Sequence, residues 1–489
     1  MEGKKIAIIA SECQPFFASG GLGDVVGSLP KRIIKLANDK ACNPNELIVI
    51  LPLYSKIAHD YRNKLVYVSQ HVVTLAWRKQ YCGIYKYVDK GVTYYFLDNE
   101  YYFKRHNFYG YFDDGERFAF FCKAAIDTLL YLGFIPDIIH VHDWQTGLVP
   151  VYLRTNYYGN IALKDTKTIF TIHNIEYQGQ YALDDDIIED VFGISHNNSY
   201  LLEYKGCLNI MKAAMECANY VTTVSPTYAK EIQTPEYAHG LDYEIRRIVE
   251  EGKLRGILNG IDKNFYNPAK DNALFEKYDK KTFEKKMINK TRLQEMLNLP
   301  VDETIPMIGM VTRLVKHKGL ELVKEAFERL MSERVQLVIL GTGDPQYEGF
   351  FKDMEYKYGS KLRVIIAFNQ DLSRKIYAAS DLFLMPSASE PCGLSQMIAS
   401  RYGSVPIVRR TGGLTDSIVD FTIEKGNGYT FDHMSADEML MVIRRALNDY
   451  NDVENWKKKT GRVMSVDFGW TGSAKMYLAM YEEILNKNN

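Results

Sequence analysis

Short apolar runs alternate with amphipathic stretches along almost the whole chain. In the first half these runs are Ile6–Ala10, Leu47–Leu51, Ile138–Val141, Thr168–Ile172 and Tyr220–Val224. In the second half they are Pro306–Val311, Val335–Leu340, Leu362–Ala367, Leu382–Met385 and Pro406–Val408. Several runs are apolar at nearly every position, which is typical of parallel strands covered on both faces. The pattern predicts an α/β fold with two doubly wound domains.

The pattern is interrupted near Arg255–Pro268, where glycine, asparagine and proline residues surround one short apolar run. A lysine-rich helical stretch follows at Asp279–Lys290, and a last helix is predicted at Trp470–Leu485. A chain of 489 residues suits two domains of ordinary size. We therefore predict an N-terminal domain over residues 1–255, a C-terminal domain over 256–465 and a final helix within 466–489.

Composition excludes several classes of function. The formal net charge of −1 provides no overall field that would attract nucleic acid or an anionic membrane. The seven cysteines are scattered singly, which favours a reducing compartment over a disulfide framework. The first apolar run is too short for a secretory signal, and no segment approaches the length of a membrane span. We expect a cytoplasmic protein, and its oligomeric state is not predicted.

Two glycine pairs follow predicted strands in the two halves of the chain. Gly20-Gly21 follows the first strand, and Gly412-Gly413 follows the strand at Pro406–Val408. A loop without Cβ atoms can approach a ligand closely, and the helix behind it offers free N–H groups. Glycine also serves tight turns for steric reasons alone. The two pairs suggest, without deciding, two loops that face a shared cleft.

The densest group of candidate residues lies in the second half. Glu390 follows the strand at Leu382–Met385, so it should lie at the same sheet edge as Gly412-Gly413. Arg313 and Lys318 flank another strand end, where cations would suit a diphosphate leaving group. Each feature also has an ordinary explanation: a glutamate that complements a helix dipole, and a solvated basic cluster.

Taken in order, the motifs of this chain resemble those of the bacterial glycogen synthase and plant starch synthase family. The motifs are Ser19-Gly20-Gly21-Leu22 with Asp24, His142-Asp143-Trp144, Thr171-Ile172-His173-Asn174, Asn259-Gly260-Ile261-Asp262, Arg313 with Lys318-Gly319, Gly341-Thr342-Gly343-Asp344, and Glu390-Pro391-Cys392-Gly393-Leu394. Each motif is weakly specific, but the ordered set covers residues 6 to 475 and is highly specific.

The resemblance implies a fold and a reaction. The fold would be of the GT-B type, in which two Rossmann-like domains face a central cleft and the C-terminal helix crosses back to the first domain. The first domain would bind the glucan acceptor and the second the nucleotide sugar. The reaction would transfer glucose from ADP-glucose to the non-reducing 4-OH of an α-1,4-glucan with retention of configuration, without a metal or other cofactor.

The resemblance also implies roles for individual residues. Glu390, Arg313, Lys318 and His173 would be catalytic, with the two cations neutralising the diphosphate. The residues expected to bind the donor are Ser19, Gly20, Gly21, Asp24, Asn259, Gly343, Phe368, Cys392, Gly393, Leu394, Thr411, Gly412 and Gly413. Asp143 and Tyr111 would contact the acceptor, although the aromatic run at 107–112 could equally serve packing. For Trp144, packing remains at least as good an explanation as ligand contact.

The chain departs from the family pattern at two places. Ala18 stands where the family's commonest form has a lysine, and Ala388-Ser389 precede Glu390 where many relatives carry Arg-Phe. We expect these changes to alter affinity more than activity. Asp184-Asp185-Asp186 superficially offers the metal-binding pattern of other sugar transferases, but acids at a helix start are the better explanation.

Three alternatives remain open from the sequence. The donor could be UDP-glucose, because an aromatic ring at Phe368 would stack on either base. The chain could be a glucan-binding pseudo-transferase in which Ala18 marks decay. A phosphorylase of related architecture would require a lysine that binds pyridoxal phosphate.

Overall fold

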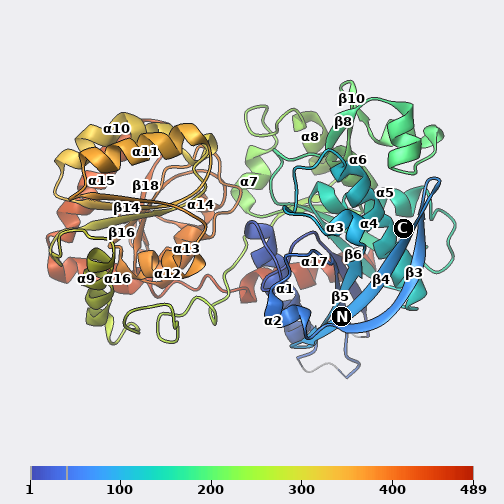
Figure 1. The fold of residues 1–489 in the computed structure, drawn as a ribbon, viewed down its shortest axis with the longest axis horizontal. Helices are drawn as coiled ribbons and strands as arrows, with labels where there is room; N and C mark the ends of the chain where they lie inside the picture. The colour runs from blue at the N-terminus through green and yellow to red at the C-terminus, as the bar shows by residue number, and fades with distance from the viewer. Residues whose placement is uncertain (1–2, 40–41, 488–489) are drawn as a thin grey trace. The chain divides into compact units, whose positions relative to one another are not determined.

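The computed structural model describes residues 3–39 and 42–487 and divides the chain into two compact units. The first unit extends to Asn259 and resumes at Trp470, and the second is Gly260–Gly469 (Figure 1). Each unit is built on its own β-sheet with helices packed against it. The predicted α/β class is confirmed.

The first unit contains a large mixed sheet. Its strands are β1 (Lys5–Ile9), β2 (Glu46–Pro52), β3 (Val66–Leu75), β4 (Arg78–Asp89), β5 (Val92–Asp98), β6 (Ile138–His142), β7 (Lys167–Ile172), β11 (Tyr220–Thr223) and β12 (Leu254–Gly256). Their order is β12-β11-β7-β6-β1-β2-β5-β4-β3. All neighbours from β12 to β5 are parallel, whereas β4 runs antiparallel to both β5 and β3. A small separate sheet contains β8 (Gln180–Ala182), β9 (Glu203–Tyr204) and β10 (Cys207–Asn209).

The second unit has a fully parallel sheet. Its strands are β13 (Met307–Val311), β14 (Gln336–Gly341), β15 (Leu362–Ile366), β16 (Leu382–Met385), β17 (Val405–Arg409) and β18 (Tyr429–Phe431). Their order is β15-β14-β13-β16-β17-β18, with every neighbouring pair parallel. Each of the ten apolar runs predicted from the sequence coincides with a strand to within one residue at either end.

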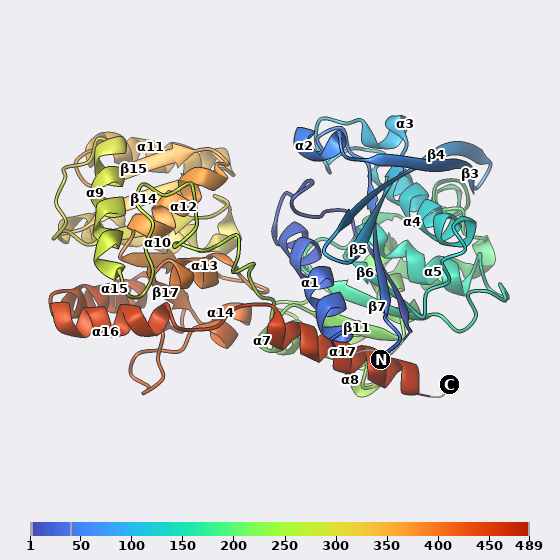
Figure 2. The same ribbon diagram turned by 90° about the horizontal axis from the view of Figure 1, so that it is seen from below.

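The antiparallel pair β3 and β4 was not predicted. β3 is the edge strand of the first sheet (Figure 2). Only two of its ten residues, Val73 and Leu75, are buried. A strand buried on one face only lacks the continuous apolar run that marks the parallel strands. The hydrophobic pattern of β3 therefore does not indicate a strand in the sequence.

Helices cover both sheets. In the first unit they are α1 (Gly21–Ala37), α2 (His59–Arg62), α3 (Glu100–Phe103), α4 (Asp114–Tyr131), α5 (Leu148–Arg154), α6 (Ile210–Cys217), α7 (Pro226–Glu231), α8 (Asp242–Glu250) and α17 (Thr471–Asn486), with the short turns η1 (Trp144–Thr146), η2 (Ile187–Val191) and η3 (His196–Leu201). In the second unit they are α9 (Lys286–Met296), α10 (Leu320–Ser332), α11 (Pro345–Lys357), α12 (Gln370–Ala379), α13 (Ser395–Arg401), α14 (Gly412–Ser417), α15 (Ala436–Tyr450) and α16 (Val453–Val463), with the turns η4 (Phe283–Lys285) and η5 (Lys316–Lys318).

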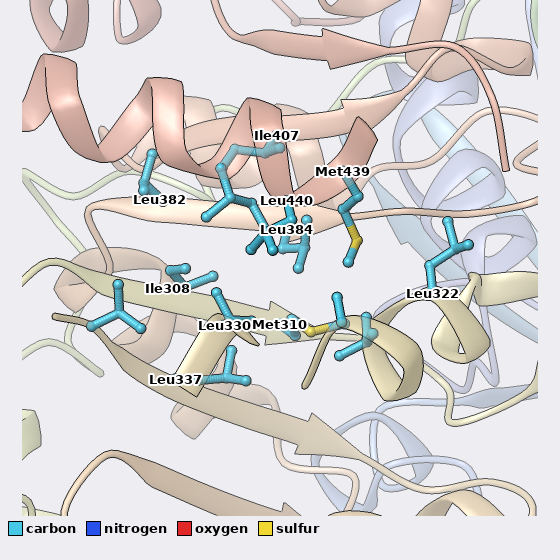
Figure 3. Packing of buried hydrophobic residues seen from close by; sticks show 14 of the residues in the cluster. Ile308, Met310, Leu322, Leu330, Leu337, Leu382, Leu384, Ile407, Met439 and Leu440 are labelled. Carbon is cyan, nitrogen blue, oxygen red and sulfur yellow. The ribbon is translucent and has the colours of Figure 1, made fainter. Parts of the chain in front are cut away.

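The core of the second unit shows how alternation along a strand fills two faces. Ile308 and Met310 of β13 pack with Leu322 and Leu330 of α10 in one cluster (Figure 3). Met307, the neighbour of Ile308, belongs to a separate cluster on the other face with residues of α9 and α12. Successive side chains of a strand point to opposite faces, so both faces need cover by helices.

The C-terminal helix packs within the first unit, as the resemblance implied. α17 lies against α1 (Figure 2), and the Tyr481 hydroxyl lies 2.8 Å from Nδ1 of the buried His140. Near its end, Glu483 accepts hydrogen bonds from the Tyr220 hydroxyl at 2.5 Å and from Arg255 at 2.8 Å. These contacts fix the helix to the sheet of the first unit.

One helix boundary was predicted wrongly. The lysine-rich stretch was expected to be helical from Asp279, but α9 begins only at Lys286. The Asp279 side chain accepts the backbone N–H groups of Lys281 and Thr282, which forms a local turn in place of a helix. No helix within the described part of the chain combines the length and the apolar character needed to cross a lipid bilayer.

Candidate functional site

The strand order of the second unit brings the candidate residues to one edge of its sheet. The order reverses between β13 and β16, and at such a point the loops after the two strands separate and leave room for a ligand. Arg313 and Lys318 lie in the loop after β13, and Glu390 lies in the loop after β16. The sequence-based expectation that these residues share one sheet edge agrees with this topology.

Glu390 and Lys318 form a close, largely buried ion pair. The Lys318 Nζ atom lies 2.7 Å from Glu390 Oε2, and the two side chains are only 14% and 9% exposed. The Ser387 hydroxyl donates to the same carboxylate oxygen at 3.0 Å. The pair holds one positive and one negative charge at fixed positions. Charges fixed in this way can stabilise the charge that develops in a transition state.

The loop that carries Glu390 is held by its neighbours. Arg409, buried in β17, donates hydrogen bonds to the carbonyl groups of Ser387 at 2.8 Å and Ala388 at 2.5 Å. The Ala388 N–H donates to the carbonyl of His317 at 2.8 Å. Sequence reasoning missed Arg409 because nothing in a strand sequence shows which carbonyl groups its guanidinium will reach.

Arg313 contrasts with Lys318. Its side chain is exposed, and among the described residues no carboxylate lies within ion-pair distance of its guanidinium. A planar guanidinium without an internal partner suits a planar or tetrahedral oxyanion such as a diphosphate. Of the two cations in this loop, Lys318 is held in place by Glu390, and Arg313 has no carboxylate partner among the described residues.

The second glycine pair packs directly against the Glu390 loop. A Cβ atom on Gly412 would lie 2.1 Å from the Glu390 carbonyl oxygen, and one on Gly413 would lie 2.2 Å from that of Cys392. The Gly413 N–H donates to the Glu390 carbonyl at 3.1 Å. Glycine is required here by close approach of two backbones. Thr411 precedes α14 as its N-cap residue and is fully buried.

The remaining donor-side candidates of the second unit surround this edge. Gly343 follows β14, and its N–H donates to the Glu348 carboxylate at 2.8 Å. Phe368 follows β15 with 82% of its side chain exposed, so its ring is available for stacking. Gly393 adopts a left-handed backbone with φ of 69°, and Leu394 is the N-cap residue of α13.

In the first unit the strand order reverses between β1 and β6. Glu12, Ser19 and Gly20 follow β1, Asp143 follows β6 and His173 follows β7. The His173 N–H donates to Asp143 Oδ1 at 2.7 Å, which joins two of these loops. Asp143 has a φ of 56° and a ψ of 177°, a conformation that costs free energy for any residue other than glycine.

The ionisation of this cluster is shifted by burial. Burial lowers the pKa of His173 to about 3, so its imidazole is neutral at physiological pH. Its Nε2 atom lies 3.0 Å from Nδ1 of His142, whose own Nε2 is buried and has no hydrogen-bond partner among the described residues. Burial raises the pKa of Asp143 to about 7, and the Glu12 charge adds to that rise. His173 therefore acts as a neutral hydrogen-bonding group.

Glu12 is a residue that sequence reasoning did not single out. Its buried carboxylate accepts hydrogen bonds from the Ser19 backbone N–H at 2.5 Å and from the Tyr109 hydroxyl at 2.6 Å. The Tyr111 hydroxyl, in the same aromatic run as Tyr109, accepts from the Asn107 N–H at 2.7 Å. The signal in the sequence that could have identified Glu12 is its place just after the first buried strand.

Three further residues named from the sequence lie in the first unit. Asn259 is 6% exposed, and its buried Oδ1 atom has no hydrogen-bond partner within residues 3–39 and 42–487. Asp24 lies in the first turn of α1. Trp144 packs edge-on against Phe118 and its ring lies 2.6 Å from where a Gly179 Cβ would stand, which supports a packing role.

The acidic triplet lies at the start of a helical turn. Asp184 accepts the N–H of Asp186 at 2.9 Å, and Asp185 lies 3.0 Å from His196. Across residues 3–39 and 42–487, no three histidine, cysteine, aspartate or glutamate side chains are grouped so that they could hold a metal ion.

Comparisons with known proteins place both units in described families. Residues 5–247 match the model of the starch synthase catalytic domain, and residues 292–463 match that of glycosyl transferases group 1. The chain is 45% identical over 485 residues to a glycogen synthase of Anoxybacillus flavithermus, covering 98% of each chain. It is 46% identical over 487 residues to a glycogen synthase of Geobacillus thermodenitrificans, covering 99% of this chain and 98% of the relative.

Solved structures give the same result. The catalytic domain of starch synthase IV from Arabidopsis thaliana, bound to ADP and acarbose, matches with a TM-score of 0.91 and 34% identity, covering 99% of this chain and 100% of that one. Sucrose-phosphate synthase of Thermosynechococcus elongatus matches with a TM-score of 0.63 at 17% identity, which shows only a shared fold.

Proposed function

Because this chain belongs to the glycogen and starch synthase family, we propose that it transfers glucose from ADP-glucose to the non-reducing 4-OH of an α-1,4-glucan with retention of configuration. The observation that carries the proposal is the Lys318–Glu390 ion pair beside the unpaired Arg313 at one sheet edge. This is the charge arrangement that departure of a diphosphate requires.

The proposed chemistry assigns a role to each charged group. Arg313 and Lys318 neutralise the diphosphate as its leaving oxygen gains negative charge. The diphosphate then helps to remove the proton of the attacking hydroxyl on the same face of the sugar. Glu390 contacts the transferred glucose and is held in place by Lys318 and Ser387. A retaining hydrolase has two carboxylates close together at the sugar. The Glu390 carboxylate is bonded instead to Lys318 and Ser387.

The proposed roles of the two units follow the same division. The second unit binds the nucleotide sugar through the loops after β13, β16 and β17, with Phe368 stacked on the base. The first unit binds the glucan, with Asp143 and His173 facing the reacting sugar. ADP is favoured over UDP as the nucleotide because the matched starch synthase IV domain binds ADP. A reducing, cytoplasmic location is proposed because the seven cysteines are scattered singly along the chain.

The test is release of nucleoside diphosphate from ADP-glucose and UDP-glucose, with and without maltoheptaose, while oligosaccharide length is followed. We expect release of ADP that depends on glucan, with stepwise lengthening. The Glu390→Gln variant should lose at least about a hundredfold in rate, because the charge near the transferred sugar is removed. Glucan binding without release from either donor would instead establish a pseudo-transferase, and full activity of Glu390→Gln would refute the residue assignment.

A further inference from the structure

Three histidine side chains of the first unit lie in contact at the ends of two neighbouring strands. His140 and His142 belong to β6, and His173 follows β7, which pairs with β6 in parallel. The rings of His140 and His142 are stacked with their centroids 4.4 Å apart, and Nδ1 of His142 lies 3.0 Å from Nε2 of His173. Only His173 has a role in the proposed transfer, so its contact with His142 needs an explanation of its own.

The fold holds His142 in place without help from a ligand. The residue is 1% exposed. Its backbone N–H donates to the Thr146 hydroxyl at 2.7 Å, and that hydroxyl donates to the His142 carbonyl at 2.7 Å. His140, on which the His142 ring is stacked, lies 2.8 Å from the Tyr481 hydroxyl and 2.6 Å from the Thr171 hydroxyl. The position of the His142 ring is therefore fixed by buried contacts of the first unit.

His173 is bonded to two consecutive residues, His142 and Asp143. Its backbone N–H donates to Asp143 Oδ1 at 2.7 Å, and its Nε2 contacts the His142 ring. The His173 side chain is partly exposed, and its Nδ1 has no hydrogen-bond partner in the described part of the chain. One ring nitrogen is thus bonded within the protein, and the other is available to a ligand.

The direction of the hydrogen bond between the two rings decides what His173 offers to that ligand. Burial lowers the pKa of both imidazoles, so each is neutral and has one N–H group and one lone pair. If Nε2–H of His173 donated, His142 would carry its own proton on Nε2. That atom is buried and has no hydrogen-bond partner among residues 3–39 and 42–487.

The opposite direction leaves the smaller defect. If Nδ1–H of His142 donates, only a lone pair stays unbonded at its buried Nε2. Buried N–H groups without an acceptor are rarer in proteins than buried acceptors without a donor. His173 then accepts at Nε2 and carries its proton on Nδ1, the nitrogen that is available to a ligand.

We propose that His142 is a positioning residue whose Nδ1–H donates to Nε2 of His173 and thereby fixes His173 as a hydrogen-bond donor through Nδ1. The group that suits this donor is a neutral sugar oxygen, which accepts a hydrogen bond. His173 cannot take a proton from an attacking hydroxyl, because its lone pair is bonded to His142. The contact with sugar rests on the proposed glucose transfer, whereas the hydrogen bond between the rings concerns the first unit alone.

The first experiment locates the two protons by NMR of the full chain. The chain has ten histidines, and labelling them with 15N makes every imidazole nitrogen observable. Nitrogens with and without a proton have widely separated 15N shifts. The variants His142→Phe and His173→Asn each lack one ring and so identify its signals. We expect the proton on Nδ1 in both rings of the native chain, and protons on Nε2 in both rings would overturn the proposal.

The second experiment compares three variants by kinetics and thermal melts. His142→Phe keeps a flat ring and removes the N–H donor. His142→Asn places an amide N–H group close to the position of Nδ1. His140→Gln is the matched control, because it alters the neighbouring buried ring and leaves the contact with His173 intact. Release of ADP from ADP-glucose with maltoheptaose gives kcat and KM, and the melts give Tm.

We expect His142→Phe to lower kcat about tenfold, the effect of losing about one hydrogen bond, and to let the His173 proton occupy both nitrogens. His142→Asn should restore most of kcat and return the proton to Nδ1. His140→Gln should lower Tm with little change in kcat, since Tyr481 and Thr171 lose part of their bonding.

Two kinetic results would overturn the positioning role. One is a fall of Tm in His142→Phe with kcat unchanged, and the other is an equal loss of kcat in His142→Phe and His142→Asn. If His142→Phe fails to fold, the native spectrum and His142→Asn still decide. A native chain with both protons on Nδ1 that releases no ADP would refute the proposed function and leave the hydrogen bond established. An active chain with both protons on Nε2 would refute this inference alone.

Discussion

The two glycine pairs of this chain look alike in sequence and differ in structure. Gly20 has an extended backbone with φ of −168°, and a Cβ atom on it would meet nothing within 4 Å. Gly412 has a φ of 43°, and a Cβ atom on it or on Gly413 would lie little more than 2 Å from a carbonyl oxygen of the Glu390 loop. The second pair is required by packing, whereas packing does not explain Gly20.

The electrostatic surroundings of the two pairs differ as well. The first pair adjoins the Glu12 carboxylate, and the second adjoins the loop in which Glu390 is paired with Lys318. The same two-letter motif thus occurs beside a carboxylate with no ion-pair partner in the described part of the chain in one unit, and beside an ion pair in the other. The comparison teaches that a repeated glycine pair indicates a tight strand-to-helix connection and does not by itself identify a phosphate site.

The largest expected effect tests the cationic side of the comparison. Lys318→Ala should lower the rate of glucose transfer by about a hundredfold to a thousandfold, because a charge aimed at the leaving group is lost and Glu390 is left unpaired. Lys316→Ala, an exposed neighbour in the same turn, is the matched control and should change the rate less than threefold. Equal effects of the two substitutions would mean that the rate depends on the total positive charge of this turn and not on the position of Lys318.

The next effect tests the packing difference directly. Gly413→Ala should lower the free energy of unfolding by about 3 kcal/mol, since its Cβ atom would overlap the backbone of Cys392. Gly20→Ala should change it by less than about 0.5 kcal/mol, since nothing lies near its Cβ atom. Urea unfolding of both variants provides the measurement, and similar losses would show that the two loops are equally constrained.

A smaller effect concerns the support of the Glu390 loop. Arg409→Lys should lower kcat about tenfold with little change in Tm, because one ammonium group cannot reach the carbonyl groups of Ser387 and Ala388 together. Arg410→Lys is the control, since Arg410 pairs with Asp432 where both side chains are about half exposed. A fall in Tm without a fall in kcat would make Arg409 only structural.

A pH dependence of stability is expected in the first unit as well. Between pH 3.8 and about 7, folded Asp143 keeps a proton that the unfolded chain has released. The free energy of unfolding should therefore fall by up to about 1.4 kcal/mol for each pH unit as the pH rises through this range. Asp143→Asn should remove that slope, and the exposed Asp165→Asn should not. The free energy of unfolding is measured from pH 4 to pH 8 in the native chain and in both variants. If Asp143 titrates normally, the native chain and Asp143→Asn will show the same slope with pH.

The sequence by itself determined the parallel strands, the class of fold and the identity of most candidate residues. Buried parallel strands require long apolar runs, which can be read directly, and ordered motifs indicate a family without any coordinates. The same pattern could not show β3, because its burial depends on what packs on one face. Nor could it show that Asp279 would form a turn before α9.

Only the tertiary structure decided which groups touch. Glu12 reaches Tyr109 across 97 positions of sequence, and Lys318 reaches Glu390 across 72. Such partners depend on strand order, which short-range patterns do not encode. The pKa values of Asp143 and His173 likewise follow from burial by distant segments. Local composition determines which elements form, and the packing of those elements determines charge, proton affinity and the ligand that each loop can bind.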